Sequence, residues 1–170
     1  QDTINLVKQN RGIDVEFDKD MSDPKVYKLW QEGNTSGIFQ FESQGMTNFM
    51  KELKPDCLED LIAGVSLYRP GPMDQIPRYI RGKQNPGHNE YTHPSLEPIL
   101  NVTYGCMVYQ EQVMQIVRDL AGYSLGRADL VRRAMGKKKL DVMAKEREVF
   151  INGQVDENGN IIVPGCVRNG

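Results

Sequence analysis

Apolar residues recur along the chain at intervals of three and four, which is the spacing of one buried face of an α-helix. This pattern predicts about seven short helices, preceded by the end of another helix at Asp2 to Gln9. The predicted helices are Pro24 to Gly33, Ser43 to Leu53, Cys57 to Leu67, Ser95 to Leu100, Tyr109 to Ala121, Ser124 to Gly136 and Leu140 to Phe150. Several of these helices have residues that favour a helix boundary. Asp23 and Pro24 are typical of the start of a helix, and glycine is typical of its end.

The same spacing predicts which residues of each helix face inward. The expected inward sets are Val26, Leu29 and Trp30; Met46, Phe49, Met50 and Leu53; Leu58, Leu61, Ile62 and Val65; Val113, Ile116, Val117 and Leu120; and Val142, Met143 and Val149. Within residues 36–46, Ile38, Gln40 and Glu42 alternate with Phe39 and Phe41, which predicts a short extended segment.

Prolines and one glycine turn interrupt the helices. Tyr68 to Pro72 places two prolines around Gly71, so Arg69 is expected on a stiff corner of the backbone. Asn158-Gly159 lies between extended residues and predicts a β-hairpin from Gly153 to Pro164. The fold class is therefore mainly α, with several short helices, proline-stiffened loops and a small β-hairpin near the C-terminus.

The segment Ala128 to Lys139 has the most pronounced charge of the chain, with five basic residues and one acid. Ala128, Val131 and Met135 lie at helical spacing and Leu130 pairs with Ala134, so one side of this segment is expected to pack inward. Arg132 and Arg133 are expected to point in different directions, because neighbours lie about 100° apart around a helix. Gly136 is expected to end the helix in the left-handed conformation, leaving Lys137, Lys138 and Lys139 beside the free carbonyls. The segment is either a solvated basic face or a contact for polyphosphate or nucleic acid.

Net charge and cysteine content exclude few classes of protein. Net charge is −2 over 170 residues, but residues 1–60 carry −5 and residues 127–147 carry +5, so the asymmetry is local. Cys57, Cys106 and Cys166 have no zinc spacing and are interpreted as reduced cytosolic thiols, which predicts a cytoplasmic protein without membrane contact. Asp18 and Asp20, and His88 and His93, are interpreted as surface or capping residues, so no metal site is predicted. The chain begins without Met, and we expect it to be a piece of a longer protein.

Five segments carry a family resemblance. They are SGIFQFESQGM, LKPDCLEDLIAGVSLYRPGP, YGCMVYQEQVMQI, LAGYSLGRADLVRRAMGKKK and MAKEREVF, in this order. Together they resemble the alpha subunits of bacterial DNA polymerase III, the DnaE type of polymerase family C, over roughly residues 1–152. The resemblance implies that residues 1–30 leave the palm, residues 31–152 form part of the fingers, and residues 153–170 form a hairpin insertion and a truncated end.

The resemblance also implies a function. It implies a replicative DNA-directed DNA polymerase whose Mg²⁺-binding aspartates lie in the palm, upstream of Gln1, so this segment alone is expected to be inactive and to bind no cofactor. In the fingers, the residues implied to bind the incoming dNTP are Arg132, Arg133, Lys137, Arg69, Gln40, Ser43 and Gly45. Those implied to hold primer-template DNA are Arg78, Arg81, Lys83, Lys138 and Lys139. Further partners implied for the whole subunit are the sliding clamp and other replisome subunits.

Two alternatives stay open at this point. One is a non-catalytic helical module that binds the DNA backbone, and it predicts duplex affinity that falls steeply with salt. The other is an interaction domain whose basic face docks an acidic partner.

Overall fold

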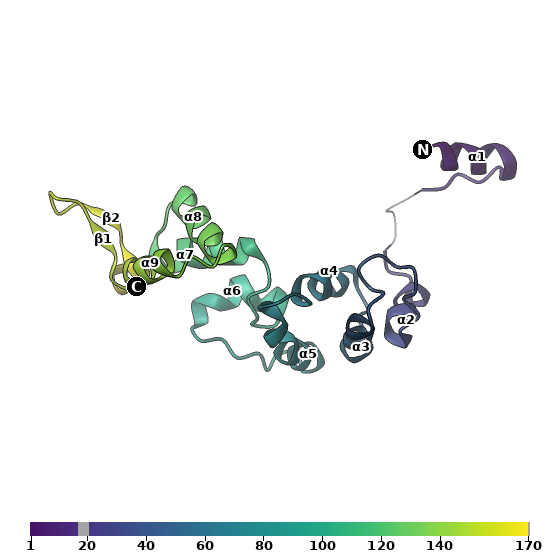
Figure 1. Ribbon diagram of the computed structural model, residues 1–170, viewed down its shortest axis with the longest axis horizontal. Helices are drawn as coiled ribbons and strands as arrows, with labels where there is room; N and C mark the ends of the chain where they lie inside the picture. The colour runs from purple at the N-terminus through teal and green to yellow at the C-terminus, as the bar shows by residue number, and fades with distance from the viewer. Residues whose placement is uncertain (17–20, 170) are drawn as a thin grey trace. The chain divides into compact units, whose positions relative to one another are not determined.

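The computed structural model describes residues 1–16 and 21–169, and packing divides the chain into unit 1, Gln1–Gly64, and unit 2, Val65–Gly170 (Figure 1). The described residues form α1 (Asp2–Arg11), α2 (Pro24–Glu32), α3 (Gln44–Leu53), α4 (Leu58–Leu67), α5 (Ile76–Gln84), α6 (Glu97–Leu100), α7 (Gln110–Ala121), α8 (Leu125–Gly136), α9 (Leu140–Asn152) and α10 (Gly165–Asn169). Three 3-10 helices, η1 (Pro72–Gln75), η2 (Pro94–Leu96) and η3 (Asn101–Thr103), and two strands, β1 (Gln154–Val155) and β2 (Ile161–Val163), complete the described fold. The mainly α prediction is confirmed.

The helix boundaries follow the capping signals of the sequence. Asp23, Ser43 and Ser124 each accept a hydrogen bond from a backbone N–H in the first turn of α2, α3 and α8. Gly33 and Gly122 end α2 and α7 in the left-handed conformation, with φ of 77° and 71°. Local sequence therefore sets where these helices begin and end.

In unit 1, α3 buries its predicted face and α2 does not. Met46, Phe49, Met50 and Leu53 are all buried. The prediction for α2 is wrong for Val26 and Leu29, which are exposed, whereas Trp30 is half-buried and Tyr27 is the buried residue. Tyr27 buries a larger apolar surface than either aliphatic residue, and its hydroxyl donates to the Met21 carbonyl.

The predicted extended segment between residues 36 and 42 is a series of turns instead. Gly37 and Gln40 have φ of 77° and 68°, and left-handed residues reverse the chain direction. Backbone N–H groups of Ile38 and Phe41 donate back across three residues, which closes two turns. Phe41 is buried, whereas Phe39 is exposed. The two turns produce this difference in exposure, because residues 36–42 form no strand.

The predicted inward face of α4 is also wrong. Leu58 and Ile62 are exposed, whereas Asp60, Ala63 and Leu67 are buried. Gly64 explains the rotation: a Cβ there would lie 2.6 Å from the terminal methyl carbon of Met50, so the small-residue side packs tightly. Asp60 is tolerated on that side because its carboxylate accepts from the Asp56 N–H at 3.1 Å.

Unit 2 is held together by a core beneath the basic helix α8. The buried residues of this core are Val117, Ala121, Tyr123, Ala128, Val131 and Val163, with Met143, Val149 and Phe150 of α9 packed against them. Val113, Ile116 and Leu120 are only half-buried, so α7 shows part of its predicted stripe. Val142 is half-buried as well.

The predicted hairpin is confirmed. Strands β1 and β2 pair antiparallel, with Gln154 opposite Val163, and Gly159 takes a φ of 82° in the turn. The Asp156 carboxylate accepts from the backbone N–H groups of Asn158 and Asn160, which closes the turn. Helices α5 and α10 were not predicted. The division into residues 1–30, 31–152 and 153–170 stays a prediction.

Candidate phosphate and nucleic-acid interface

Two arginines of the basic helix α8 donate hydrogen bonds to the same carboxylate. Arg132 donates from Nε to Oδ1 of Asp129 at 2.8 Å, and Arg133 donates from Nε to Oδ2 of Asp129 at 2.7 Å. Arg132 also donates from Nη1 to the side-chain oxygen of Gln110, at the start of α7, at 2.7 Å. The Arg132 and Arg133 guanidiniums lower the pKa of the Asp129 carboxyl below its usual value.

Arg132 and Arg133 both reach Asp129, although neighbouring residues lie about 100° apart around a helix. Asp129 lies three residues before Arg132 and four before Arg133, and both spacings place side chains on the same stretch of helix surface. The long side chains bridge the angle between their Cα positions. The Arg133 side chain is 65% exposed, against 29% for Arg132, so Arg133 is the more open of the two to solvent.

The end of α8 also differs from the expectation. Gly136 is the last helical residue, but the left-handed residue is Lys138, with φ of 52°. Lys137, Lys138 and Lys139 are all exposed. Met135 is exposed too and lines an apolar groove of about 540 Å³ between α7, α8 and α9. Leu130 is also exposed, so of the expected inward residues Ala128, Val131 and Ala134 are buried.

The start of α8 is fixed by a different kind of pair, an arginine with a glutamate. Arg127 binds Glu146 of α9 through two hydrogen bonds of 3.0 and 3.1 Å, and it also donates to the side chain of Gln154. Its guanidinium carbon lies 5.1 Å from the centre of the Tyr123 ring. Burial, followed by the hydrogen bond and charge of Glu146, raises the pKa of the Tyr123 hydroxyl. Arg127 is therefore a structural residue that orients α8.

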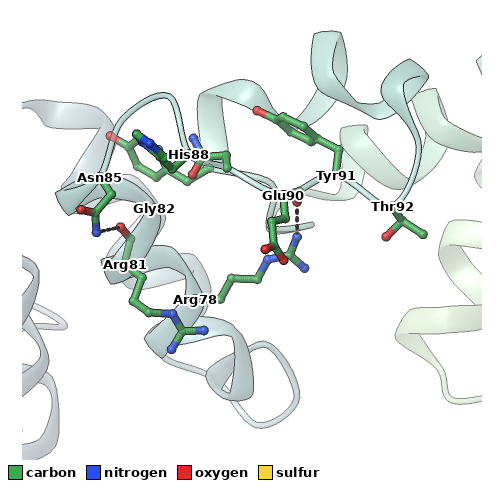
Figure 2. Close-up of a pocket in the computed structure, with 10 residues that line it drawn as sticks. Arg78, Arg81, Gly82, Asn85, His88, Glu90, Tyr91 and Thr92 are labelled. Carbon is green, nitrogen blue, oxygen red and sulfur yellow. Dashed lines mark hydrogen bonds between the residues drawn. The ribbon is translucent and has the colours of Figure 1, made fainter.

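A separate cationic cavity of about 880 Å³ lies in unit 2, between α5 and the loop of residues 85–92 (Figure 2). Arg78 and Arg81 of α5 line it, and Figure 2 shows the Arg78 guanidinium reaching the Glu90 backbone carbonyl, to which Nη2 donates at 2.6 Å. Burial raises the pKa of the Cys106 thiol, and the nearby charges of Arg78 and Arg81 oppose that shift. Both arginines therefore lie close enough to Cys106 to influence its thiol.

The wall of this cavity is closely packed. A Cβ at Gly82 would lie 2.4 Å from the Tyr104 Cβ and 2.7 Å from the Asn89 side-chain oxygen. Tyr104 in turn packs edge-on against buried Tyr79, with ring centres 5.0 Å apart. The loop is therefore seated on α5 by side chains that a single methyl group would displace.

The remaining predicted dNTP residues lie apart from these two cationic regions in the sequence. Arg69 is exposed and donates from Nε to the Ser66 carbonyl at 3.0 Å. Ser43 uses its hydroxyl to cap α3, Gln40 is the left-handed turn residue, and Gly45 is half-buried in α3; these three belong to unit 1. The structure assigns none of them to α8. Their place in a nucleotide pocket, like the DNA contact of Lys83, stays a prediction.

Asp56, Cys57 and Asp60 are the only group of three potential metal donors that lies close together among residues 1–16 and 21–169. Asp60 already accepts the Asp56 N–H, and burial raises the pKa of the Cys57 thiol to about 11. A metal-bound cysteine is a thiolate, so this thiol is a poor ligand, and we interpret the cluster as a helix cap. Asp18 and Asp20 lie outside the described residues. His93 caps η2 by accepting the Ser95 N–H, as predicted.

Sequence reasoning missed two residues that organise these regions. Asp129 stands at the spacing that joins an acid to both following arginines, so its role was readable from the sequence. Gln112 was not readable: it is buried, accepts from the Val108 and Tyr109 N–H groups, and donates to the Ile99 carbonyl and Thr103 hydroxyl. Its partners come together only in the fold.

The fold and these two regions define a helical module that carries its arginines on short helices. The family model described as the bacterial DNA polymerase III alpha subunit finger domain matches residues 1–158, so the chain belongs to this family. It is 52% identical over 154 residues to the DNA polymerase III subunit alpha of Thermus aquaticus, a match that covers 87% of this chain and 13% of that protein.

Two further relatives give the same result. Identity is 48% over 154 residues to the DNA polymerase III subunit alpha of Aquifex aeolicus, covering 89% of this chain and 13% of the relative. It is 49% over 157 residues to that of Staphylococcus aureus strain COL, covering 92% and 15%. The chain thus spans about one seventh of the length of the relatives it matches. Within the described residues, no helix has the length and hydropathy to cross a membrane.

Proposed function

We propose that this chain is the fingers segment of a replicative DNA-directed DNA polymerase and that α8 binds the triphosphate of the incoming dNTP. The observation that carries the proposal is the arginine pair on Asp129, with Arg133 exposed at the end of a rigid helix. Guanidiniums match the paired oxygens of phosphate groups, and Lys137 adds a point charge one turn further on. The family and its named relatives support this assignment.

The proposed chemistry needs no acid, base or nucleophile from α8. Negative charge grows on the leaving pyrophosphate during nucleotidyl transfer, and fixed cations aimed at it stabilise the transition state. Asp129 holds both guanidiniums in place before the nucleotide arrives, which reduces the ordering cost of binding. In the proposal, Mg²⁺ is held by carboxylates outside this chain, so the chain alone does not extend a primer.

The proposal includes primer-template DNA as the second ligand. Lys138 and Lys139, which follow the end of α8, and Arg78, Arg81 and Lys83 on α5 are proposed to contact DNA phosphates. The sliding clamp and other replisome subunits are proposed to bind parts of the subunit beyond this chain.

The test is Arg133→Ala in a full-length alpha subunit that contains this chain. We expect kcat/KM for the nucleotide to fall on the order of 10- to 100-fold, while the Kd for primer-template changes less than about twofold. Arg118→Ala is the matched control, because it removes one exposed positive charge from α7 without touching α8. An unchanged dependence of rate on nucleotide concentration in Arg133→Ala would overturn the proposal. Equal losses in nucleotide use and duplex affinity would favour the DNA-backbone module instead.

A further inference from the structure

We propose that the cavity between α5 and residues 85–92 binds one unpaired nucleotide of single-stranded DNA, with its phosphate on Arg81 and its base against Tyr91. The proposal rests on the proposed function, because it places the template strand of the polymerase in this cavity. It goes further by assigning a base-binding site, where the proposed function assigns only contacts to phosphate.

The cations of the cavity lie on one face of α5. Arg78 and Arg81 are three residues apart, so their side chains emerge from the same side of the helix. Arg78 is committed to the Glu90 carbonyl, which is a neutral acceptor, so its charge is not cancelled by that contact. Arg81 is exposed, and its guanidinium extends from α5 in Figure 2, which leaves it available to a phosphate.

The volume and lining point to a base as well as a phosphate. A cavity of about 880 Å³ falls in the size range of sites for whole small molecules and exceeds what one phosphate fills. Tyr91 and His88 contribute aromatic rings to the lining, and the amides of Asn85 and Asn89 contribute donors and acceptors for a base edge. Stacking on aromatic rings is how proteins hold unpaired bases without regard to sequence.

A duplex does not fit this combination of groups. In double-stranded DNA the base faces are covered by their neighbours, so a ring inside a concave site meets a base only when the nucleotide is unstacked. The carboxylate of Glu90 also lines the cavity, and it would repel a second phosphate while accepting a base amino group. The cavity therefore suits a single nucleotide that enters base first.

The cavity is formed before any ligand binds. The Arg78–Glu90 hydrogen bond and the close approach of Gly82 to Tyr104 and Asn89 fix the loop on α5. Gly105 adds to this, because a Cβ there would lie 3.0 Å from the Glu90 carbonyl oxygen and 3.8 Å from the Tyr91 ring. The Tyr91 ring therefore lies close to Gly105, which has no side chain.

The first test compares two DNA ligands in a full-length alpha subunit that contains this chain. One ligand is a primer-template with a single-stranded template overhang of about ten nucleotides, and the other is the blunt duplex. For Arg81→Ala we expect about fivefold weaker binding to the overhang ligand, a salt slope smaller by about 0.7, and a change below twofold on the blunt duplex. Arg118→Ala, a charge-matched variant, should leave the difference between the ligands unchanged. Equal weakening on both ligands would show a duplex contact and overturn the proposal.

The second test addresses the base. With 2-aminopurine placed in turn at each overhang position, one position should be quenched in the wild type and in Tyr91→Phe, and released in Tyr91→Leu, which keeps apolar volume but has no ring. An abasic site at that position should weaken wild-type binding about fivefold and have no effect in Tyr91→Leu. Quenching that is the same in all three proteins, or an abasic effect that persists in Tyr91→Leu, would overturn the base-binding site.

These outcomes are separate from those of the proposed function. Arg133→Ala reports on nucleotide use, whereas the variants at Arg81 and Tyr91 report on the overhang. If Arg133→Ala does not change nucleotide use but Arg81→Ala still weakens binding of the overhang ligand, the cavity is a single-strand site on a module that does not bind dNTP through α8. Circular dichroism and thermal melting of each variant ensure that the binding losses do not reflect unfolding.

Discussion

The two cationic regions of unit 2 hold their arginines against opposite kinds of partner. On α8, Arg132 and Arg133 share the ionised carboxylate of Asp129, and the surface around Arg133 is open. On α5, Arg78 donates to the neutral carbonyl of Glu90 inside a cavity whose wall is packed around Gly82. The first region is a pair of charges anchored by an acid, and the second is a shaped site anchored by backbone.

The difference bears on what each region binds well. An arginine held by a carboxylate is well oriented, but an incoming phosphate must share its guanidinium with that acid. Such a site suits a highly charged ligand like a triphosphate, which competes well for the remaining N–H groups. An arginine held by a carbonyl keeps its charge in a concave site, which suits a ligand with one phosphate and a large uncharged part.

The largest expected effect tests whether the region on α5 is more tightly packed than the region on α8. Gly82→Ala places a methyl group 2.4 Å from the Tyr104 Cβ, so we expect it to lower the free energy of unfolding by about 3 kcal/mol. Gly136→Ala, the matched change on α8, meets nothing within 4 Å and is expected to raise it by about 0.5 kcal/mol. Chemical denaturation of both variants checks this, and similar effects from the two would contradict the contrast in packing.

The next effect concerns how α8 is fixed at its start. The Arg127 side chain is 22% exposed and that of Glu146 14%, and Arg127→Ala leaves Glu146 without this partner. We expect a loss of about 2 kcal/mol in the free energy of unfolding. Arg147→Ala is the control: its contact with Glu148 is 3.4 Å long and both side chains are about two-thirds exposed, so the loss should stay below about 0.5 kcal/mol. A loss of that small size in Arg127→Ala would show that the network does not support α8.

The sequence predicted helix ends better than helix faces, and the reason is physical. Caps such as Ser124 and Gly122 act within a few residues, so local sequence contains all the information they need. The buried side of α4 depends on Gly64 meeting Met50, fourteen positions away, and apolar spacing alone pointed to Leu58 and Ile62 instead. For short helices with apolar residues on more than one side, the neighbours decide which side is buried.

The same distinction holds for the candidate site: its local features could be predicted from the sequence, and those that depend on the fold could not. The basic residues of α8 were visible from charge and spacing, and even the tether to Asp129 follows from positions on one helix. The cavity on α5 was not visible, because it needs residues 85–92 to fold back beside α5, which brings the Glu90 carbonyl to Arg78. Only Arg78 and Arg81 could be named beforehand, and as contacts for phosphate rather than as residues that line a cavity.

The smallest expected effect follows from the chemistry of the two anchors, because a carboxylate titrates and a backbone carbonyl does not. Arg133 and Arg132 hold the pKa of folded Asp129 below the ordinary value of 3.8. A carboxyl whose folded pKa is depressed stabilises the protein above its unfolded pKa, and this contribution is lost as pH falls through the folded pKa. Acidification below about pH 4 should therefore release Arg132 and Arg133 and leave the Arg78–Glu90 contact intact.

The measurement is the difference in free energy of unfolding between the wild type and Asp129→Asn, followed from neutral pH to about pH 2. We expect the wild type to be more stable at neutral pH and the difference to shrink on acidification. In an Arg132→Ala, Arg133→Ala background the same substitution should show no such dependence on pH, since the partners that lower the pKa are absent. A pH-dependent difference that survives in that background would mean that Asp129 is held by other groups, and the contrast between an acid anchor and a carbonyl anchor would no longer distinguish the two regions.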